Sequence, residues 1–347
     1  MLLEKINDNT TFAYMPQLDA IYSVINLVDG EDGLEFCRDI YGDEQVEKWR
    51  KKYPFLVETS IAIKNIYPLG IWDFILDMQL EGLGLEQYHK NLKDIKPEDF
   101  LWRVFDLDFV EGASKEAIVE AFTEDKALNE VYDWVKADCE SFLAFTAFVR
   151  YSERYIDEFF ALAKEMQQAY PDELFEKQEA LVEAMRKEVM AGVAQLGAFE
   201  YSQKVMGKTF RNRGPYERFI FVPSYTMNRR VVRFFNVKEN HKTQVMFLSL
   251  KENKRNQEDV LRVLKAMGDG TRYQILALLA KEGTMRGMDI AKKVSVATST
   301  VSHHMEQLKE SGLITEEQVK NSKYYGLNRN AATELIKDLQ KDLGLSE

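Results

Sequence analysis

The 347-residue sequence is poor in cysteine, with only Cys37 and Cys139. The two residues are far apart and form no CxxC pair, so they supply neither a redox motif nor the disulfide framework of a small secreted protein. We therefore expect both side chains to be buried thiols.

Long apolar runs are also missing. No stretch of about eighteen uncharged apolar residues is present, so no membrane-spanning helix and no membrane partner are expected. The first residues, MLLEKINDNTTF, include acidic and polar side chains too early for a secretory signal. These two absences predict a cytoplasmic protein.

Common catalytic and cofactor motifs are absent from residues 1–250. We find no GxxxxGKS/T, GxGxxG, HExxH, GxSxG or CxxC pattern there. Each of these patterns places a nucleophile, a metal ligand or a phosphate-binding backbone where its chemistry needs it. We therefore expect no enzymatic activity and no cofactor.

Charge is spread unevenly along the chain, whose formal net charge is −11. Residues 1–203 hold 41 acidic and 20 basic side chains, whereas residues 204–250 hold two acidic and ten basic ones. Residues 251–347 are nearly neutral. This asymmetry indicates an acidic body, a basic segment and a separate C-terminal module.

The first part of the chain has a helical pattern. Apolar residues recur at three- and four-residue spacing in 17–28, in 71–80 and in most of 114–206. Pro171 is expected to interrupt the last of these stretches. We predict an acidic helical domain over residues 1–206, with a sensing or regulatory role.

The pattern changes to strands in the basic segment. Three runs rich in Phe, Val and Ile, separated by polar turns, predict a small three-stranded antiparallel sheet within 207–250. A polar stretch follows, in which we place a linker at 251–257, and helical periodicity resumes in 258–347. The predicted fold class is therefore α+β, mainly α.

The C-terminal module has four elements in a specific order. GDGTRYQIL (268–276) opens a helix, MDIAKKVSVATSTVSHHMEQLKESGLI (288–314) gives helix, tight turn and helix, and KNSKYYGLN (320–328) gives a polar loop and a strand. Together these elements resemble the winged helix-turn-helix of ArsR/SmtB-type bacterial repressors. The resemblance implies a transcriptional regulator, a repressor, that binds a pseudo-palindromic operator in double-stranded DNA as a homodimer.

Helical periodicity sorts the second helix of this motif into two faces. Val301, Met305 and Leu308 lie at i, i+4 and i+7 and are expected to face the core. The outward face carries small hydrogen-bonding groups and one imidazole, which suit base edges and phosphates, and the polar loop adds two cations. The predicted DNA-contacting residues are Thr298, Ser299, Thr300, Ser302, His303, Gln307, Lys320 and Lys323.

The adjacent histidines His303 and His304 could indicate a metal site or catalysis. Adjacent residues on a helix diverge by about 100°, so they cannot readily hold one ion, for which i, i+4 spacing is needed. No nucleophile or carboxylate set of recognisable spacing lies nearby. We assign His303 to DNA contact and His304, beside the apolar stripe, to packing.

The sequence departs from the family pattern at several positions. Many members of the family sense metals through cysteines in the first helix of the motif, or through histidine and acidic pairs in the last helix. Here TMRGMDI and AATELIKDLQKDLGL lack cysteine and histidine, so no metal is expected at either place. Gly270 replaces a usual proline, leaving Asp269 or Thr271 as a cap, and Ala297 replaces a usual serine, leaving Thr298 to cap or contact DNA.

Apolar stripes flank the motif on both sides. A domain of this size is expected to be too small to bury both stripes internally, so we predict that they form the interface of a homodimer. The predicted dimerisation residues are Val260, Leu261, Leu264, Leu335 and Leu339.

The basic segment allows three interpretations. Its sheet could pack on the acidic body and pair its arginines with carboxylates there, contact DNA phosphates beside the winged helix, or hold an anionic effector. Arg229, Arg230 and Arg233 form the candidate accessory patch. We expect the sheet to couple the body to the DNA-binding module.

The role of the N-terminal region has two interpretations as well. All four tryptophans, Trp49, Trp72, Trp102 and Trp134, lie there, either as aromatic core or as the lining of a pocket for an unknown small-molecule effector. A regulator whose N-terminal domain senses a non-metal signal or mediates interactions is favoured. The alternative is an enzyme or protein-interaction scaffold that carries the winged helix as a partner-binding module.

Overall fold

The chain forms two compact units. Unit 1 consists of Met1–Ala191 and Pro215–Lys251, and unit 2 consists of Gly192–Gly214 and Glu252–Glu347. None of the described helices is long and apolar enough to cross a membrane. The computed structural model describes residues 2–28, 30–63, 70–137, 139–210, 213–227, 231–236, 242–251, 257–319 and 322–345.

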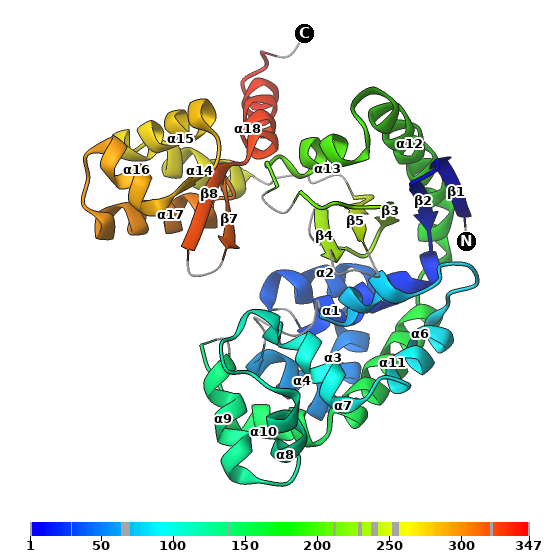
Figure 1. Cartoon of the computed structure of the whole chain (residues 1–347). Helices are drawn as coiled ribbons and strands as arrows, with labels where there is room; N and C mark the ends of the chain where they lie inside the picture. The colour runs from blue at the N-terminus through cyan, green and yellow to red at the C-terminus, as the bar shows by residue number, and fades with distance from the viewer. Residues whose placement is uncertain are drawn as a thin grey trace. The chain divides into compact units, whose positions relative to one another are not determined.

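Unit 1 is mainly helical (Figure 1). Its helices are α1 (Asp19–Val28), α2 (Glu31–Tyr41), α3 (Asp43–Lys52), α4 (Pro54–Ala62), α5 (Gly70–Asp73), α6 (Leu85–Lys93), α7 (Pro97–Val104), α8 (Lys115–Ala121), α9 (Asp125–Val135), α10 (Phe142–Arg150), α11 (Ser152–Gln168) and α12 (Asp172–Leu196). The last residues of α12, after Ala191, belong to unit 2.

The helical pattern predicted for residues 1–206 is confirmed in most of its length. The stretch 17–28 forms a 3-10 turn followed by α1, and Pro171 separates α11 from α12 as expected. The helix expected over 71–80 is wrong in its second half, because α5 passes into the 3-10 helix Phe74–Asp77 and the chain is extended at Met78.

The sheet of unit 1 differs from the prediction. Its strands are β1 (Leu2–Asn7), β2 (Thr10–Tyr14), β3 (Arg218–Ser224), β4 (Val231–Asn236) and β5 (Thr243–Ser249), in the order β1-β2-β3-β5-β4. The three strands expected in the basic segment are confirmed. An antiparallel three-stranded sheet is wrong, because β3 pairs in parallel with both β2 and β5 and an N-terminal hairpin adds two strands.

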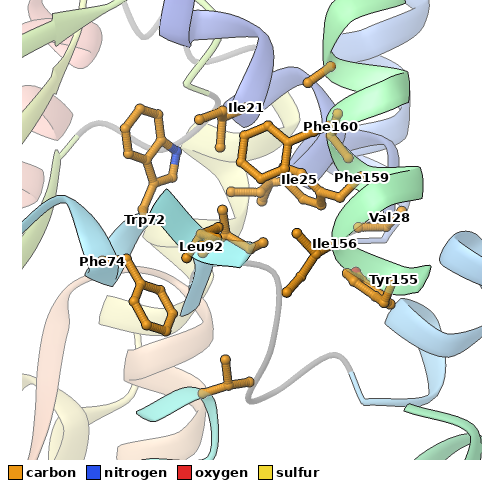
Figure 2. Packing of buried hydrophobic residues seen from close by; sticks show 14 of the residues in the cluster. Ile21, Ile25, Val28, Trp72, Phe74, Leu92, Tyr155, Ile156, Phe159 and Phe160 are labelled. Atoms are coloured by element: carbon orange, nitrogen blue, oxygen red, sulfur yellow. The ribbon is translucent and has the colours of Figure 1, made fainter. Parts of the chain in front are cut away.

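The core of unit 1 joins the helices to one face of this sheet. Figure 2 shows Ile21 and Ile25 of α1 among side chains of α11, α6 and the α5 segment. Trp49 and Trp72 are each 1% exposed within this core, so the aromatic-core interpretation is confirmed for them, and Trp102 and Trp134 pack against it partly buried. Both cysteines are buried, as expected.

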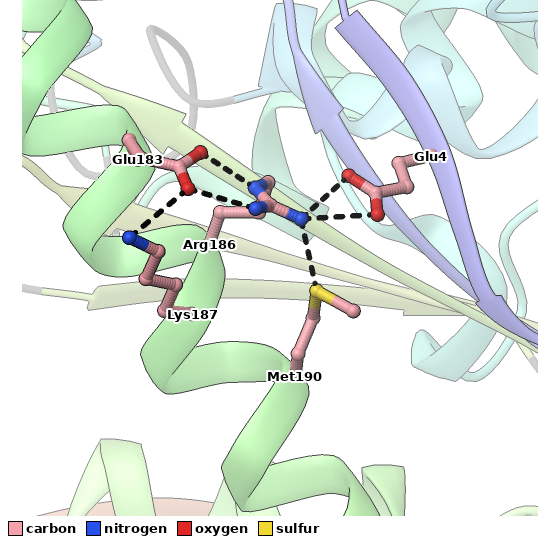
Figure 3. Close-up of polar contacts among 5 residues, drawn as sticks. All are labelled: Glu4, Glu183, Arg186, Lys187 and Met190. Carbon is pink, nitrogen blue, oxygen red and sulfur yellow. Dashed lines mark hydrogen bonds and ion pairs between the residues drawn. The ribbon is translucent and has the colours of Figure 1, made fainter.

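Helix α12 is tied to the N-terminal hairpin by Arg186 (Figure 3). Its Nη1 donates to both carboxylate oxygens of Glu4 on β1, each at 3.0 Å. Its Nε and Nη2 donate to Glu183 one turn earlier, and these hydrogen bonds lower the pKa of Glu183 to about 2. The Arg186 guanidinium thus binds two carboxylates from different elements, Glu4 on β1 and Glu183 on α12.

Unit 2 contains the predicted winged helix-turn-helix. In this unit a tight turn separates α16 from α17, and the Ser295 backbone in the turn has the left-handed conformation, with φ of 56°. Strands β6, β8 and β7 form an antiparallel sheet in that order, with the β7–β8 hairpin as the wing. The elements are α13 (Ala198–Met206), α14 (Gln257–Met267), α15 (Gly270–Glu282), β6 (Met285–Arg286), α16 (Gly287–Val294), α17 (Thr298–Glu310), β7 (Ile314–Val319), β8 (Ser322–Leu327) and α18 (Arg329–Asp342).

Helix α13 joins this unit through the beginning of α18. Asn330 Nδ2 donates to the carbonyl oxygens of Lys204 and Val205 at 3.1 and 2.7 Å, which satisfies carbonyls at the end of α13. Gly207 follows in the left-handed region with φ of 70°, and a Cβ there would lie 2.7 Å from Asn328 Oδ1. Glycine is therefore needed at 207 for both its backbone conformation and the close approach.

Candidate DNA-binding site

The candidate recognition helix, α17, is fixed to the core of unit 2 by one apolar stripe. Val301, Met305 and Leu308 are each at most 1% exposed and pack in a cluster with Ile275 and Ile290. The core face predicted from the sequence is confirmed. Packing of this stripe fixes the position of α17 and leaves the opposite face of the helix exposed.

Five of the predicted contact residues are exposed on α17. The Ser302 hydroxyl donates to the Thr298 carbonyl at 3.0 Å, so its oxygen remains available as an acceptor. Ala297 is the N-cap and provides no side-chain cap, and Thr298 is the first helical residue rather than a cap. The first N–H groups of α17 are thus open to a phosphate oxygen. The exposed residues are Thr298, Ser299, Thr300, Ser302 and His303.

Gln307 contacts other side chains of the protein. It is half-buried, and its Oε1 accepts a hydrogen bond from Arg272 Nη1 while its Nε2 lies 3.2 Å from His303 Nε2. The sequence did not identify Arg272 as a residue of the site. No local pattern could, because the interaction joins the start of α15 to the second half of α17.

His304 faces inward from α17. Its side chain is 13% exposed, and Nδ1 lies 3.9 Å from Asp269 Oδ1. Asp269 caps α15 by accepting from the Arg272 backbone N–H at 2.9 Å, which lowers the pKa of Asp269. In the parts of the chain that the structure describes, no group of three His, Cys, Asp or Glu side chains is arranged to hold a metal ion.

The wing contributes one described lysine. Lys323 is exposed, and its Nζ lies 3.2 Å from Glu316 Oε1, with Lys309 Nζ at 3.7 Å from the same oxygen. A phosphate would therefore compete with Glu316 for Lys323. Lys320 lies outside the described residues.

The accessory basic patch is described only at Arg233, in unit 1; Arg229 and Arg230 lie outside the described residues. Arg233 Nε donates to Gln244 Oε1 at 2.8 Å and Nη2 donates to the Tyr216 hydroxyl at 2.7 Å. Its guanidinium carbon also lies 4.3 Å from the centre of the Phe235 ring. Gln244 and Phe235 of the same sheet, with Tyr216 just before β3, thus hold Arg233 in place.

The predicted dimerisation residues fall into two groups. Val260 and Leu335 are 5% and 3% exposed in the core of unit 2, and Leu264 and Leu339 pack against that core partly buried. Leu261 remains 47% exposed. Further apolar side chains are exposed on α18 and just after it, namely Ile336, Leu343 and Leu345.

The C-terminal part of unit 2 is similar to known proteins. Residues 269–316 match the family model described as bacterial regulatory protein, arsR family. The chain is 34% identical over 83 residues to a cadmium resistance transcriptional regulatory protein CadC homolog from Staphylococcus aureus, covering 24% of this chain and 69% of that protein. It is 36% identical over 74 residues to the transcriptional repressor SdpR of Bacillus subtilis, covering 21% and 81%.

A solved structure is similar over the same share of the chain. It is the homodimeric winged helix-turn-helix DNA-binding domain of a possible ArsR-family transcriptional regulator from Mycobacterium bovis. Sequence identity is 26%, with 28% of this chain and 94% of that chain covered and a TM-score of 0.22. The family assignment depends on the sequence relatives and not on this likeness.

Proposed function

The chain belongs to the ArsR family of bacterial regulatory proteins through its C-terminal winged helix-turn-helix, and on this premise we propose that it is a repressor acting as a homodimer. The dimer binds a pseudo-palindromic operator in double-stranded DNA. The observation that carries the proposal is the exposed polar face of α17, set opposite a fully buried stripe. Such a helix can enter a major groove without losing its own packing.

We further propose that unit 1 senses a non-metal signal or mediates interactions and does not catalyse a reaction. The lack of cysteine and histidine at the two places where the family holds metals supports a non-metal signal. The size and separate core of unit 1 support a distinct role for it. A gel shift with the DNA upstream of the protein's own gene, at several salt concentrations, tests the DNA-binding function. Loss of all sequence preference would favour a partner-binding scaffold instead.

Two substitutions separate base contacts from phosphate contacts. His303→Ala is expected to weaken binding to the operator by about 1 to 3 kcal/mol while leaving binding to unrelated DNA unchanged, because it removes a base-edge contact. Lys323→Ala is expected to weaken binding to every sequence and to reduce the slope of log affinity against log salt by about one unit.

Fluorescence anisotropy with operator and scrambled duplexes over a salt series measures both effects. Lys337→Ala removes an exposed cation from α18 and serves as the control, with no expected change in slope. If His303→Ala retained both affinity and sequence preference, the assigned face of α17 would be incorrect.

A further pair of substitutions tests the dimer. Ile336 on α18 is 58% exposed and Leu261 on α14 is 47% exposed, so a Glu at either position adds charge to a surface that the dimer would bury. Ile336→Glu and Leu261→Glu are each expected to shift the wild-type dimer toward monomer and to weaken operator binding. Sedimentation velocity at micromolar concentration measures the mass. A monomeric wild-type chain, with and without DNA, would refute the dimer.

A further inference from the structure

The Arg272 side chain connects two helices of unit 2. Its Nε and Nη2 donate to the carbonyl oxygens of Ala266 and Lys265, at 2.5 and 3.1 Å. These carbonyls belong to the last turn of α14, where the helix offers them no N–H partners. The remaining donor, Nη1, is thereby directed to the Oε1 of Gln307 on α17.

This contact fixes the orientation of the Gln307 carboxamide. A guanidinium can only donate hydrogen bonds, so the atom that faces Arg272 must be the amide oxygen. The NH₂ group then points to the other side, where His303 Nε2 lies at 3.2 Å. Because an amide nitrogen can only donate, His303 Nε2 must accept this bond.

The proton of the neutral His303 ring is consequently held on Nδ1. The two ring nitrogens of histidine differ, and the hydrogen bond made by one sets the protonation of the other. His303 therefore presents Nδ1–H as its donor, from the exposed face of α17. In a major groove the purine N7, guanine O6 and thymine O4 atoms can accept such a bond, whereas the exocyclic amino groups of adenine and cytosine do not. N7 is the acceptor that both purines share.

We propose that Arg272 and Gln307 are positioning residues that fix the tautomer of His303, so that His303 reads the N7 acceptor of a purine in the operator. The inference rests on the proposed function, because it requires α17 to enter a major groove. It adds a specificity-determining role for two residues that do not themselves need to touch a base.

The first test is spectroscopic and needs no DNA. Long-range ¹⁵N–¹H correlation spectra of the full chain with ¹⁵N-histidine, recorded near pH 8, report the tautomer of each ring, and His303→Ala assigns the signal. We expect Nδ1–H for His303 in the wild type. Gln307→Glu keeps an oxygen for Arg272 and offers a second oxygen to His303 Nε2–H, so it is expected to reverse the tautomer.

The second test uses operator duplexes in which single purines are replaced by their 7-deaza analogues. One replacement is expected to weaken wild-type binding by about 5- to 100-fold, the usual range for one base contact. Gln307→Leu should lose this sensitivity and bind the unmodified operator less tightly by a similar factor. Gln274→Leu, an exposed glutamine of α15, is the matched control and should behave as wild type.

Three results would overturn the inference: an Nε2–H tautomer in the wild type, an unchanged tautomer in Gln307→Glu, or specific binding that is insensitive to every 7-deaza replacement. The last result, combined with a reduced salt slope in His303→Ala, would assign His303 to a phosphate. Failure of the proposed function looks different, because the wild-type chain would then show no sequence-specific binding at all.

Discussion

Replacement of Trp72 by Ala is expected to lower the free energy of unfolding of unit 1 by about 3 to 5 kcal/mol, the range for large aromatic side chains in cores. Trp72 is 1% exposed, and its ring centroid lies 5.3 Å from that of Tyr22, 5.8 Å from Tyr88 and 4.5 Å from Phe247. It thus joins α1, α6 and β5. Its removal would leave a cavity where helices and sheet meet.

Trp72→Phe is the matched comparison for this experiment. It keeps an aromatic ring against the same neighbours and removes Nε1, a buried N–H with no hydrogen-bond partner among the described residues. Removing such a group offsets part of the lost packing, so a cost well below that of the alanine variant is expected. Urea unfolding followed by the fluorescence of the other three tryptophans, all in unit 1, measures both variants. An equal loss of unfolding free energy in the two variants would mean that packing of the aromatic ring is not what stabilises unit 1 at this position.

The residues that sequence reasoning placed correctly share a local cause. The stripe of Val301, Met305 and Leu308 follows the helical period, and strands β3, β4 and β5 are dense in β-branched and aromatic side chains. In both cases the signal lies within one element. The helix-turn-helix and its exposed face could therefore be predicted.

The features that were missed depend on partners distant in the sequence. Strand β1 reads LLEKIN, in which apolar and polar residues do not alternate, so it is recognised only by its pairing with β2. The parallel pairing of β3 with β5 follows from the return path of the chain, which no strand pattern encodes. Arg272 and Asn330 likewise act on residues in other elements. Such contacts are properties of the folded chain and not of local periodicity.

Substitution of Asp19 by Asn is expected to stabilise unit 1 at alkaline pH and to remove much of the pH dependence of its stability. Asp19 is 6% exposed, and its Oδ2 accepts one backbone hydrogen bond, from Tyr225 at 3.1 Å. None of the described Lys, Arg or His side chains forms an ion pair with it. Burial therefore raises the pKa of Asp19 from its ordinary 3.8 to about 7.

The sign of the effect follows from proton linkage. Between pH 4 and pH 7 the folded state keeps a proton on Asp19 that the unfolded state has released, so stability falls as pH rises through this window. A rise of about three pKa units corresponds to a loss of about 4 kcal/mol of folding stability. This loss is complete only above pH 7. Asn resembles the protonated carboxyl in shape and can still accept from Tyr225, but it carries no charge at any pH.

Thermal unfolding of unit 1 from pH 5 to pH 8, followed by tryptophan fluorescence, distinguishes the two proteins. The unfolding temperature of the wild type should fall progressively over this range, whereas that of Asp19→Asn should change little. The difference between the two proteins should be largest at pH 8. Glu44→Gln removes a carboxylate from an exposed position on α3 and controls for the change in net charge. Parallel profiles for wild type and Asp19→Asn would show that Asp19 is ionised in the folded protein throughout, with its charge compensated by a group near α1.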